Sequence, residues 1–178
     1  MDASFRICLI VEDRYGRPLF FDLVERLKRE GFLPMHVSVP KRAIRKLPGK
    51  CNPELSRMIS AALKIGIPPF DRVVVVVDAE GGPVDGARAQ ILRHVPPDCR
   101  EKTRIVVLEY CVEEWICVGL GIPVGNDPVE SLKNWLRKTG GAKADYRKGS
   151  LPEFVPELDL NKLRTSPSFR KFLDALTP

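Results

Sequence analysis

The sequence VVVVVDAEGG occupies residues 73–82. Five consecutive valines are typical of a strand that is buried on both faces, and such strands lie in the middle of parallel sheets. The two glycines behind the acidic residues favour a sharp turn directly after the strand. This stretch therefore predicts the central strand of an α/β protein, with Asp78 and Glu80 at its carboxyl end.

Apolar runs and helical patterns alternate along the chain on both sides of this strand. Further strand patterns cover residues 5–11, 35–39 and 104–108, and helical patterns cover residues 16–30, 52–63 and 84–94. Strands that alternate with helices form right-handed βαβ units, because parallel strands need a crossover connection. We therefore predict a doubly wound, Rossmann-like fold with a mostly parallel four-stranded sheet and helices on both faces.

The pattern changes after residue 125. Asp127-Pro128 and Ser166-Pro167 each combine an N-cap residue with a proline at the first helical position, so each predicts the start of a helix. The proline-bearing stretch 151–156 is expected to be a loop. We therefore expect an α/β domain over residues 1–125 and a helical C-terminal extension over residues 126–178, packed on the same domain.

The chain is basic and contains no segment that is expected to span a membrane. The 29 Lys and Arg residues outnumber the 23 Asp and Glu residues, and the formal net charge of +6 favours anionic partners. No apolar run approaches the roughly 20 residues that span a bilayer, and the N-terminal residues show no signal peptide. The five cysteines form no CxxC pair, which indicates reduced thiols. Together these features predict a cytoplasmic protein without membrane contact.

Acidic residues follow the predicted strands at the edge where open parallel sheets bind ligands. Glu12 follows the first strand, Asp78 and Glu80 follow the third, and Glu113 lies shortly after the fourth. If the first and third strands are neighbours, Glu12 and Asp78 face each other across a crevice. Carboxylates held that close repel one another unless a cation neutralises them. A set of oxygen donors without His or Cys predicts Mg²⁺ or Mn²⁺ rather than zinc.

The order of these acids resembles that of Toprim domains, which occur in topoisomerases, primases and OLD-type nucleases. Glu12 at the end of the first strand and Asp78-x-Glu80 at the end of the third are similar to the Glu and Asp-x-Asp motifs of that family. The resemblance implies a Toprim-like fold in which Asp78 and Glu80 hold Mg²⁺ and Glu12 acts as general acid or base. Two positions depart from the family pattern: Glu80 replaces an aspartate, and Asp13 replaces the glycine that usually follows the glutamate.

A narrower resemblance is to a group of small Toprim-like proteins allied to the OLD nucleases. Their Glu-x-Trp segment is matched by residues 113–115 and their Asp-Pro helix start by Asp127-Pro128. Their Tyr-x-Lys and Ser-Pro-x-Phe segments are matched by residues 146–148 and 166–169. This resemblance covers nearly the whole chain. It implies that Glu113, rather than its neighbour Glu114, is a further metal ligand.

Two basic stretches contain candidates for binding nucleic acid. The first, residues 41–50, has five cations and no acid, and is expected to be a loop between the second strand and the next helix. The second places Tyr146, suited either to stacking on a base or to packing, before two cations. Runs of this kind are either solvated or in contact with phosphates. The candidate phosphate contacts are Lys41, Arg42, Arg45, Lys46 and Arg147.

These features predict a Mg²⁺- or Mn²⁺-dependent, nuclease-like protein that acts on phosphodiesters of DNA or RNA. In this hypothesis Asp78 and Glu80 bind the metal, Glu12 transfers a proton and Lys148 supports the phosphate. One alternative is a non-catalytic module on the same fold that binds nucleic acid or a partner protein. Assembly into a homo-oligomer or with a partner protein stays open.

Another alternative is a receiver-like phospho-acceptor signalling domain. Glu12, Asp13 and Asp78 would then be its three acids, because receivers place an acid pair after the first strand and an aspartate after the third. The residues at the end of the fourth strand, 108–110, read Leu-Glu-Tyr and contain no Ser or Thr. This sequence disfavours the receiver hypothesis.

Overall fold

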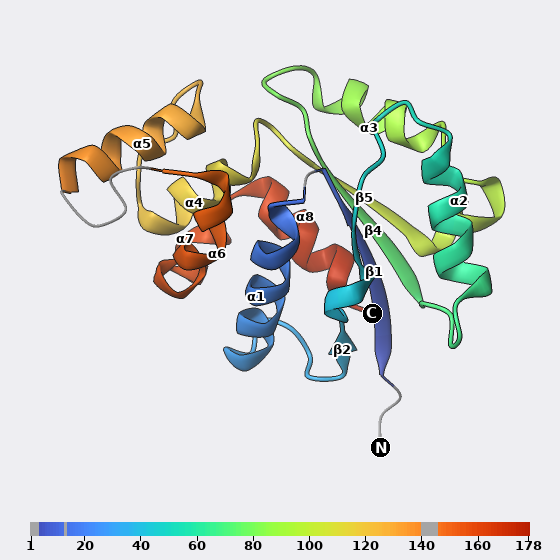
Figure 1. Ribbon diagram of the computed structural model, residues 1–178. Coiled ribbons are helices and arrows are strands. Elements are labelled where there is room, and N and C mark those ends of the chain that lie inside the picture. Colours follow the sequence, from blue (N-terminus) through green and yellow to red (C-terminus); the bar gives the residue numbers. More distant parts are fainter. Residues whose placement is uncertain (1–3, 13, 140–145) are drawn as a thin grey trace.

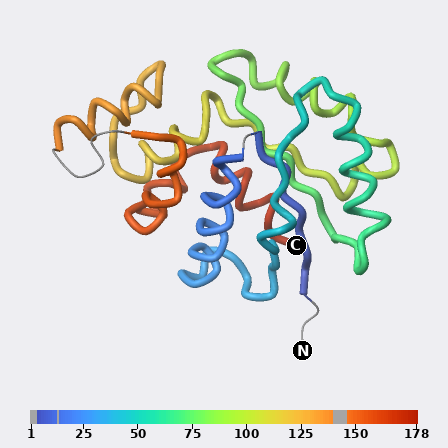
Figure 2. Tube along the Cα trace, viewed as in Figure 1, coloured from blue at the N-terminus to red at the C-terminus, as the bar shows by residue number. Residues whose placement is uncertain are grey.

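Parallel strands form the centre of the protein in a computed structural model, which describes residues 4–12, 14–139 and 146–178. The sheet has five strands in the order β2-β1-β4-β5, and β3 also pairs with β1. Each of these pairings is parallel. β1 and β4 are therefore the central strands, and the sequence predicted the central position of β4 (Figure 1, Figure 2). The strands are β1 (Phe5–Val11), β2 (Val37–Ser38), β3 (Ile44–Lys46), β4 (Arg72–Asp78) and β5 (Thr103–Leu108).

The valines of β4 bury both faces of the sheet, which confirms the prediction of a central strand. Val74 and Val76 belong to one hydrophobic cluster, and Val73, Val75 and Val77 belong to another. Successive side chains of a strand point to opposite faces, so a strand with a helical layer on each side needs apolar residues at every position. The run of five valines meets this need.

Helices cover both faces of the sheet (Figure 1). One face carries α2 and α3, whose buried residues Leu55, Ile59 and Ile91 pack with the odd-numbered valines. The other face carries α1, α4 and α8, which pack with Val74 and Val76. The bounds are α1 (Gly16–Arg29), α2 (Glu54–Ser60), continued by a π-helical turn (Ala61–Ile65), α3 (Val84–Leu92), α4 (Val112–Leu120) and α8 (Pro167–Leu176).

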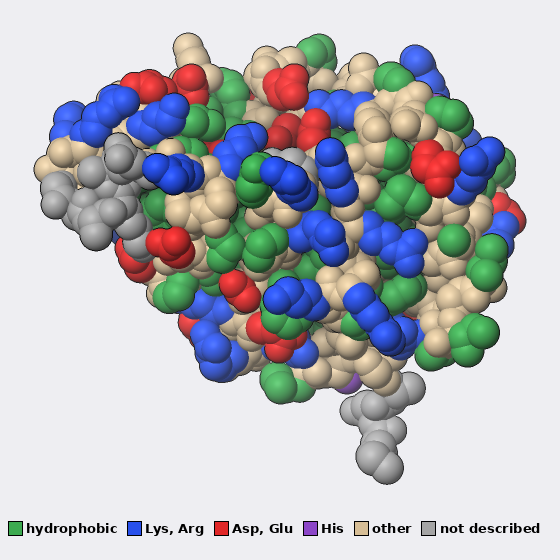
Figure 3. Space-filling view, viewed as in Figure 1, with side chains coloured by type: hydrophobic (Ala, Val, Ile, Leu, Met, Phe, Trp, Pro, Cys, Tyr) green, Lys and Arg blue, Asp and Glu red, His purple; other side chains and the backbone are tan. Residues whose placement is uncertain are grey.

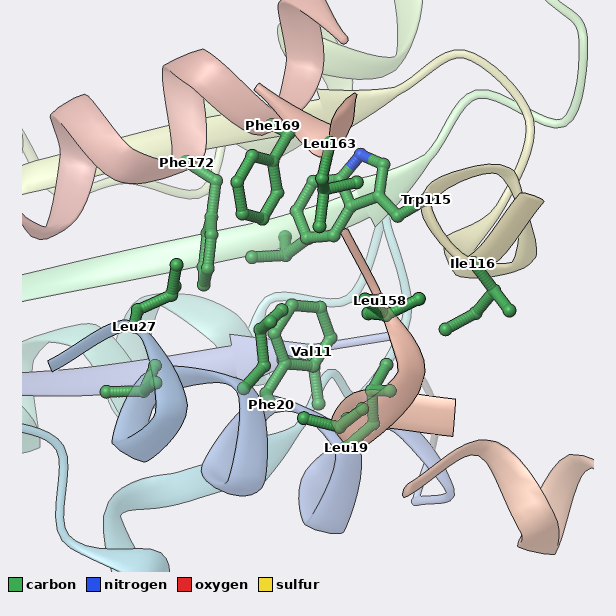
Figure 4. Close-up of a cluster of buried hydrophobic side chains, with 14 of the residues drawn as sticks. Val11, Leu19, Phe20, Leu27, Trp115, Ile116, Leu158, Leu163, Phe169 and Phe172 are labelled. Carbon is green, nitrogen blue, oxygen red and sulfur yellow. The ribbon is translucent and has the colours of Figure 1, made fainter. Parts of the chain in front are cut away.

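Aromatic side chains join the C-terminal extension to the sheet domain. Trp115 of α4 packs edge-on against Phe169 of α8, with 5.0 Å between ring centroids, and its indole N–H donates to Ser168 Oγ at 2.8 Å. Phe20 of α1 and Phe172 of α8 complete the group (Figure 4). The buried aromatic rings of α1, α4 and α8 therefore form one continuous core with the sheet.

The remaining C-terminal elements begin at the predicted caps but include helices where a loop was expected. Asp127 Oδ1 accepts from the N–H of Glu130 at 3.0 Å, and Ser166 Oγ accepts from that of Phe169 at 3.4 Å. The prediction of a loop over residues 151–156 was wrong. Leu151 and Phe154 are fully buried, and a proline fits the first turn of a helix, so the stretch folds as short helices. These elements are α5 (Pro128–Thr139), α6 (Leu151–Phe154), η4 (Lys148–Ser150), η5 (Val155–Glu157) and α7 (Leu160–Leu163).

The second predicted strand is shortened to β2, and an additional strand, β3, lies in the stretch predicted as a loop, which makes the sheet five-stranded rather than four-stranded. β2 pairs with the start of β1, and β3 pairs with its end through Ile44 opposite Leu9 and Lys46 opposite Val11. Met35, predicted to lie in the strand, is 73% exposed. The stretch 41–50 is therefore not simply a loop. Ile44 and Leu47 are buried, and their burial fixes this segment against β1.

The described residues were also searched for membrane spans. None of the helices in them is both long enough and apolar enough to cross a bilayer.

Candidate functional site

Glu12 and Asp78 meet at the carboxyl edge of the sheet. Because β1 and β4 are parallel neighbours, with Val11 opposite Val76, the residues after both strands reach the same edge. The backbone N–H of Asp78 donates to Glu12 Oε2 at 2.7 Å. Both residues line a narrow crevice of about 20 Å³, the space of about one water molecule. The prediction that these two residues converge is confirmed.

Glu80 lies on a tight turn directly behind β4. Hydrogen bonds from Ala79 N–H to the carbonyl of Leu108 and from Gly81 N–H to that of Glu109, both of 2.8 Å, hold this turn against the end of β5. The turn forces Glu80 into the left-handed region, at φ 54°, which is unfavourable for a residue with a Cβ. Its side chain is 74% exposed. The backbone therefore holds a strained acidic residue at the edge of the crevice, as is common at functional sites.

Replacing Glu80 by glycine is expected to raise the free energy of unfolding by about 1 kcal/mol, because glycine adopts positive φ without a steric penalty. Glu80→Ala is the matched control, since it removes the same carboxylate but keeps the strain. Chemical denaturation of both variants should show stabilisation by glycine alone. Equal stability of the two variants would mean that the turn is not strained at this position.

Lys50 contributes a cation to the site that the sequence analysis did not select. Its ammonium nitrogen lies 3.2 Å from Glu12 Oε1 and 3.7 Å from Glu80 Oε1. A positive charge therefore already occupies the position between these two carboxylates. The feature of the sequence that could have pointed to Lys50 is the strand β3. Once residues 44–46 are recognised as a strand parallel to β1, Lys50 follows at the carboxyl edge of the sheet.

Glu113 is the more deeply buried member of the Glu113-Glu114 pair. It is 1% exposed, and Oε1 accepts a hydrogen bond of 2.5 Å from the hydroxyl of Tyr146. Burial raises the pKa of the Cys111 thiol, and the charges of Glu113 and Asp78 raise it further. Tyr146 thus positions Glu113 through its hydroxyl, a contact that its sequence neighbours did not reveal.

Glu114 points to a different surface. Its Oε2 accepts from the backbone N–H of Tyr110 at 3.2 Å, and it borders a separate hollow together with Glu109. Burial raises the pKa of Glu114, and the charge of Glu109 adds to the effect. Adjacent helical residues point in different directions, which explains why Glu113 contacts Tyr146 while Glu114 borders a separate hollow.

The raised pKa of Glu114 predicts a pH-dependent effect of Glu114→Gln. The folded state disfavours the charged form of Glu114, so ionisation of this side chain destabilises the protein. This destabilisation is absent well below the ordinary pKa of 4.5 and appears as the pH rises through the raised pKa. The variant should unfold at a higher temperature than the parent protein at neutral pH and at the same temperature in strong acid. Thermal unfolding at both pH values tests this. A loss of stability at neutral pH would show that the hydrogen bond to Tyr110 outweighs the cost of burial.

The acids provide donors suited to a divalent metal, but their oxygens are engaged. In the described ranges, no three His, Cys, Asp or Glu side chains converge as a metal-binding group. Glu12 binds the N–H of Asp78 and the ammonium of Lys50, and Glu113 binds Tyr146. Oxygen donors are nevertheless the set that Mg²⁺ prefers, and the space between Glu12 and Glu80 accommodates a cation in the form of Lys50. These donors suit a divalent metal by their chemistry, and Oε1 of Glu80 becomes available to one only once the ammonium group of Lys50 leaves.

The candidate phosphate contacts of the first basic stretch follow the edge of the sheet toward this site. Lys41 and Arg42 are exposed on η1 (Lys41–Ala43), while Arg45 and Lys46 lie on β3, opposite Ile10 and Val11. Lys46 is thus level with the residue before Glu12. Figure 3 shows Lys and Arg side chains spread over the segment between β2 and α2. This edge of the sheet therefore combines a band of cations with the acids at its end.

The second basic stretch is exposed and follows Tyr146. Arg147 and Lys148 are exposed, and Lys148 begins η4. The hydrogen bond of Tyr146 to Glu113 connects the start of this stretch to one of the candidate acids. Asp13, one of the acids of the receiver hypothesis, lies outside the described residues.

The fold and the site define the protein as an α/β protein whose two central parallel strands end in neighbouring carboxylates. In comparisons with known proteins, no family model, curated protein or solved structure matches the chain.

Proposed function

We propose that this protein is a Mg²⁺- or Mn²⁺-dependent, nuclease-like protein that processes phosphodiesters of nucleic acid at a Toprim-type carboxylate site. The observation that carries the proposal is the contact of Asp78 N–H with the Glu12 carboxylate at the ends of the two central strands. The Glu12 carboxylate alone satisfies the backbone N–H of Asp78. The carboxylate of Asp78 is therefore not required to hold the loop at this point. Functional groups of open parallel sheets gather at the carboxyl ends of neighbouring strands, where these two acids lie.

Each acid has a role that suits its position. Asp78 and Glu80 would hold the metal, with Glu113 as a further ligand on the Cys111 side. A bound divalent metal would polarise a phosphoryl oxygen and stabilise the attacking and leaving oxygens. Glu12 would transfer the proton: Oε2 is held by the Asp78 N–H, which orients the carboxylate, and the side chain retains 28% exposure toward solvent. Lys148 would support the phosphate from the second basic stretch.

The substrate class follows from the cations beside the site. An acidic site repels a polyanion unless cations elsewhere hold its backbone. The exposed residues Lys41, Arg42 and Lys46 lie on η1 and β3, which run along β1 toward Glu12. A nucleic-acid strand bound along this edge would therefore reach the acids at its end.

A second candidate function is a non-catalytic module that binds nucleic acid or a partner protein. The observation in its favour is the ion pairing of Lys50 with Glu12 and Glu80, which neutralises these acids without a metal. In such a module the basic edge, formed by Lys41, Arg42, Arg45 and Lys46, would bind the partner. Glu12 and Glu80 would then only stabilise the turn after β4.

The two candidates differ in a cleavage assay. The purified protein is incubated with single- and double-stranded DNA and RNA in the presence of Mg²⁺ or Mn²⁺, alongside Glu12→Gln, which is nearly isosteric. Metal-dependent cleavage that Glu12→Gln lacks supports the nuclease proposal. Metal-independent binding without cleavage of any substrate favours the binding module.

A further inference from the structure

The position of Lys50 is fixed by the hydrogen bonds of the loop between β3 and α2. Asn52 fixes this loop on both sides of the lysine: its backbone N–H donates to the carbonyl of Gly49 at 3.2 Å, and its side chain donates to that of Pro48 at 3.4 Å. Asn52 Oδ1 also accepts from the N–H of Glu54 at the start of α2, at 2.9 Å. The loop is therefore tied to a helix, and Lys50 is directed toward the acids by local hydrogen bonds.

The surroundings of the ammonium group are unusual for a surface lysine. The Lys50 side chain is 21% exposed, and its nitrogen contacts two different carboxylates, from the ends of β1 and β4. Exposed ion pairs contribute little to stability, but a half-buried cation shared by two acids interacts more strongly because water screens it less. Lys50 thus neutralises both Glu80, a ligand of the proposed metal site, and Glu12, its proposed proton-transfer group.

We propose that Lys50 is a built-in competitor of the divalent metal: its ammonium group must leave Glu80, a ligand of the proposed metal site, before the metal can bind that carboxylate. This inference rests on the proposed function, because it concerns the metal affinity of the same site. An ammonium group and a metal ion cannot both take the Glu80 oxygen that now faces Lys50, and the same ammonium also lies beside Glu12. Their mutual repulsion at such short range adds to this direct competition.

The competition predicts that removing the lysine charge strengthens metal binding. Lys50→Gln is expected to bind Mn²⁺ about tenfold more tightly than the parent protein, or tighter still, because both the competitor and the repulsion are lost. Without metal, the same variant should unfold at a lower temperature, since Glu12 and Glu80 lose their counter-charge. Mn²⁺ should therefore raise its unfolding temperature more than that of the parent protein.

The measurements are a calorimetric Mn²⁺ titration and thermal unfolding with and without Mn²⁺. Lys50→Arg keeps the cation and should bind Mn²⁺ no more tightly than the parent protein. Lys102→Gln removes one exposed lysine that ends the 3₁₀ helix η3 (Pro97–Lys102), directly before β5 and thus at the opposite edge of the sheet. It should leave the Mn²⁺ affinity unchanged, because solvent screens charge at that distance.

The outcomes separate this inference from the proposed function. Tighter Mn²⁺ binding by Lys50→Gln alone supports the inference, and does so most strongly if the parent protein binds no Mn²⁺ at all. Equal or weaker binding by Lys50→Gln, beside measurable binding by the parent protein, overturns the inference and leaves the metal site standing. If no variant binds Mn²⁺, the proposed function and the inference both fail. If Lys50→Gln is unfolded in the absence of metal, folding on addition of Mn²⁺ supports the competition between Lys50 and the metal. A variant that stays unfolded with Mn²⁺ contradicts it.

Discussion

Asp78→Asn is expected to weaken Mn²⁺ binding by about a hundredfold or more and to abolish metal-dependent cleavage. The substitution replaces a charged oxygen donor by a neutral amide of nearly the same shape. The hydrogen bond to Glu12 comes from the backbone N–H of residue 78, so it persists in the variant. The loss should therefore reflect the missing ligand and not a misplaced Glu12. Calorimetric titration with Mn²⁺ and a cleavage assay measure the two effects.

Asp85→Asn is the matched control for this substitution. Asp85 is an exposed acid in the first turn of α3, seven residues further along the chain. It should leave Mn²⁺ affinity and cleavage unchanged, because it lies outside the crevice formed by Glu12 and Asp78. If Asp78→Asn binds Mn²⁺ as tightly as the parent protein, the carboxylate site is not a metal centre and the nuclease proposal loses its basis.

Neutralising three exposed cations of the basic edge should weaken nucleic-acid binding on the order of a hundredfold at low salt. The variant carries Lys41→Gln, Arg42→Gln and Lys46→Gln. Arg45 is left in place because its side chain is half-buried on β3 and its charge acts on the buried Cys8. Each lost phosphate contact should reduce the magnitude of the negative slope of log affinity against log salt by about 0.7 to 0.9. Fluorescence anisotropy over a salt series measures both quantities.

A second triple variant with the same charge change controls for net charge. Arg93, Arg100 and Lys102 are exposed cations located between the end of α3 and the start of β5, on the amino side of the sheet. Their replacement by glutamine should reduce affinity only slightly and preserve the slope. Equal effects of the two triple variants would show that the net charge of +6 attracts nucleic acid without a defined binding edge. Mn²⁺ affinity should be unchanged in both.

Local sequence patterns were enough to place β4 at the centre of the sheet, and the meeting of Glu12 with Asp78 followed on the condition that β1 pairs with β4, as it does. A strand of five valines has no polar face, so it can only lie between two layers of helices. Parallel crossovers then bring the ends of neighbouring strands to one edge of the sheet. The helix starts at Asp127 and Ser166 were equally predictable, because a cap depends on residues within one turn. These features depend on short-range chemistry or on the topology of the sheet.

The partners of the acids could not be predicted in this way, because they depend on contacts between distant parts of the chain. Lys50 reaches Glu12 only because buried Ile44 and Leu47 turn part of an apparent loop into β3 beside β1. The choice between Glu113 and Glu114 depends on how α4 is rotated against the sheet, which the packing of Trp115 on α8 decides. Rotation of a helix and pairing of a short edge strand are set by the packed core, since neither has a strong local signal.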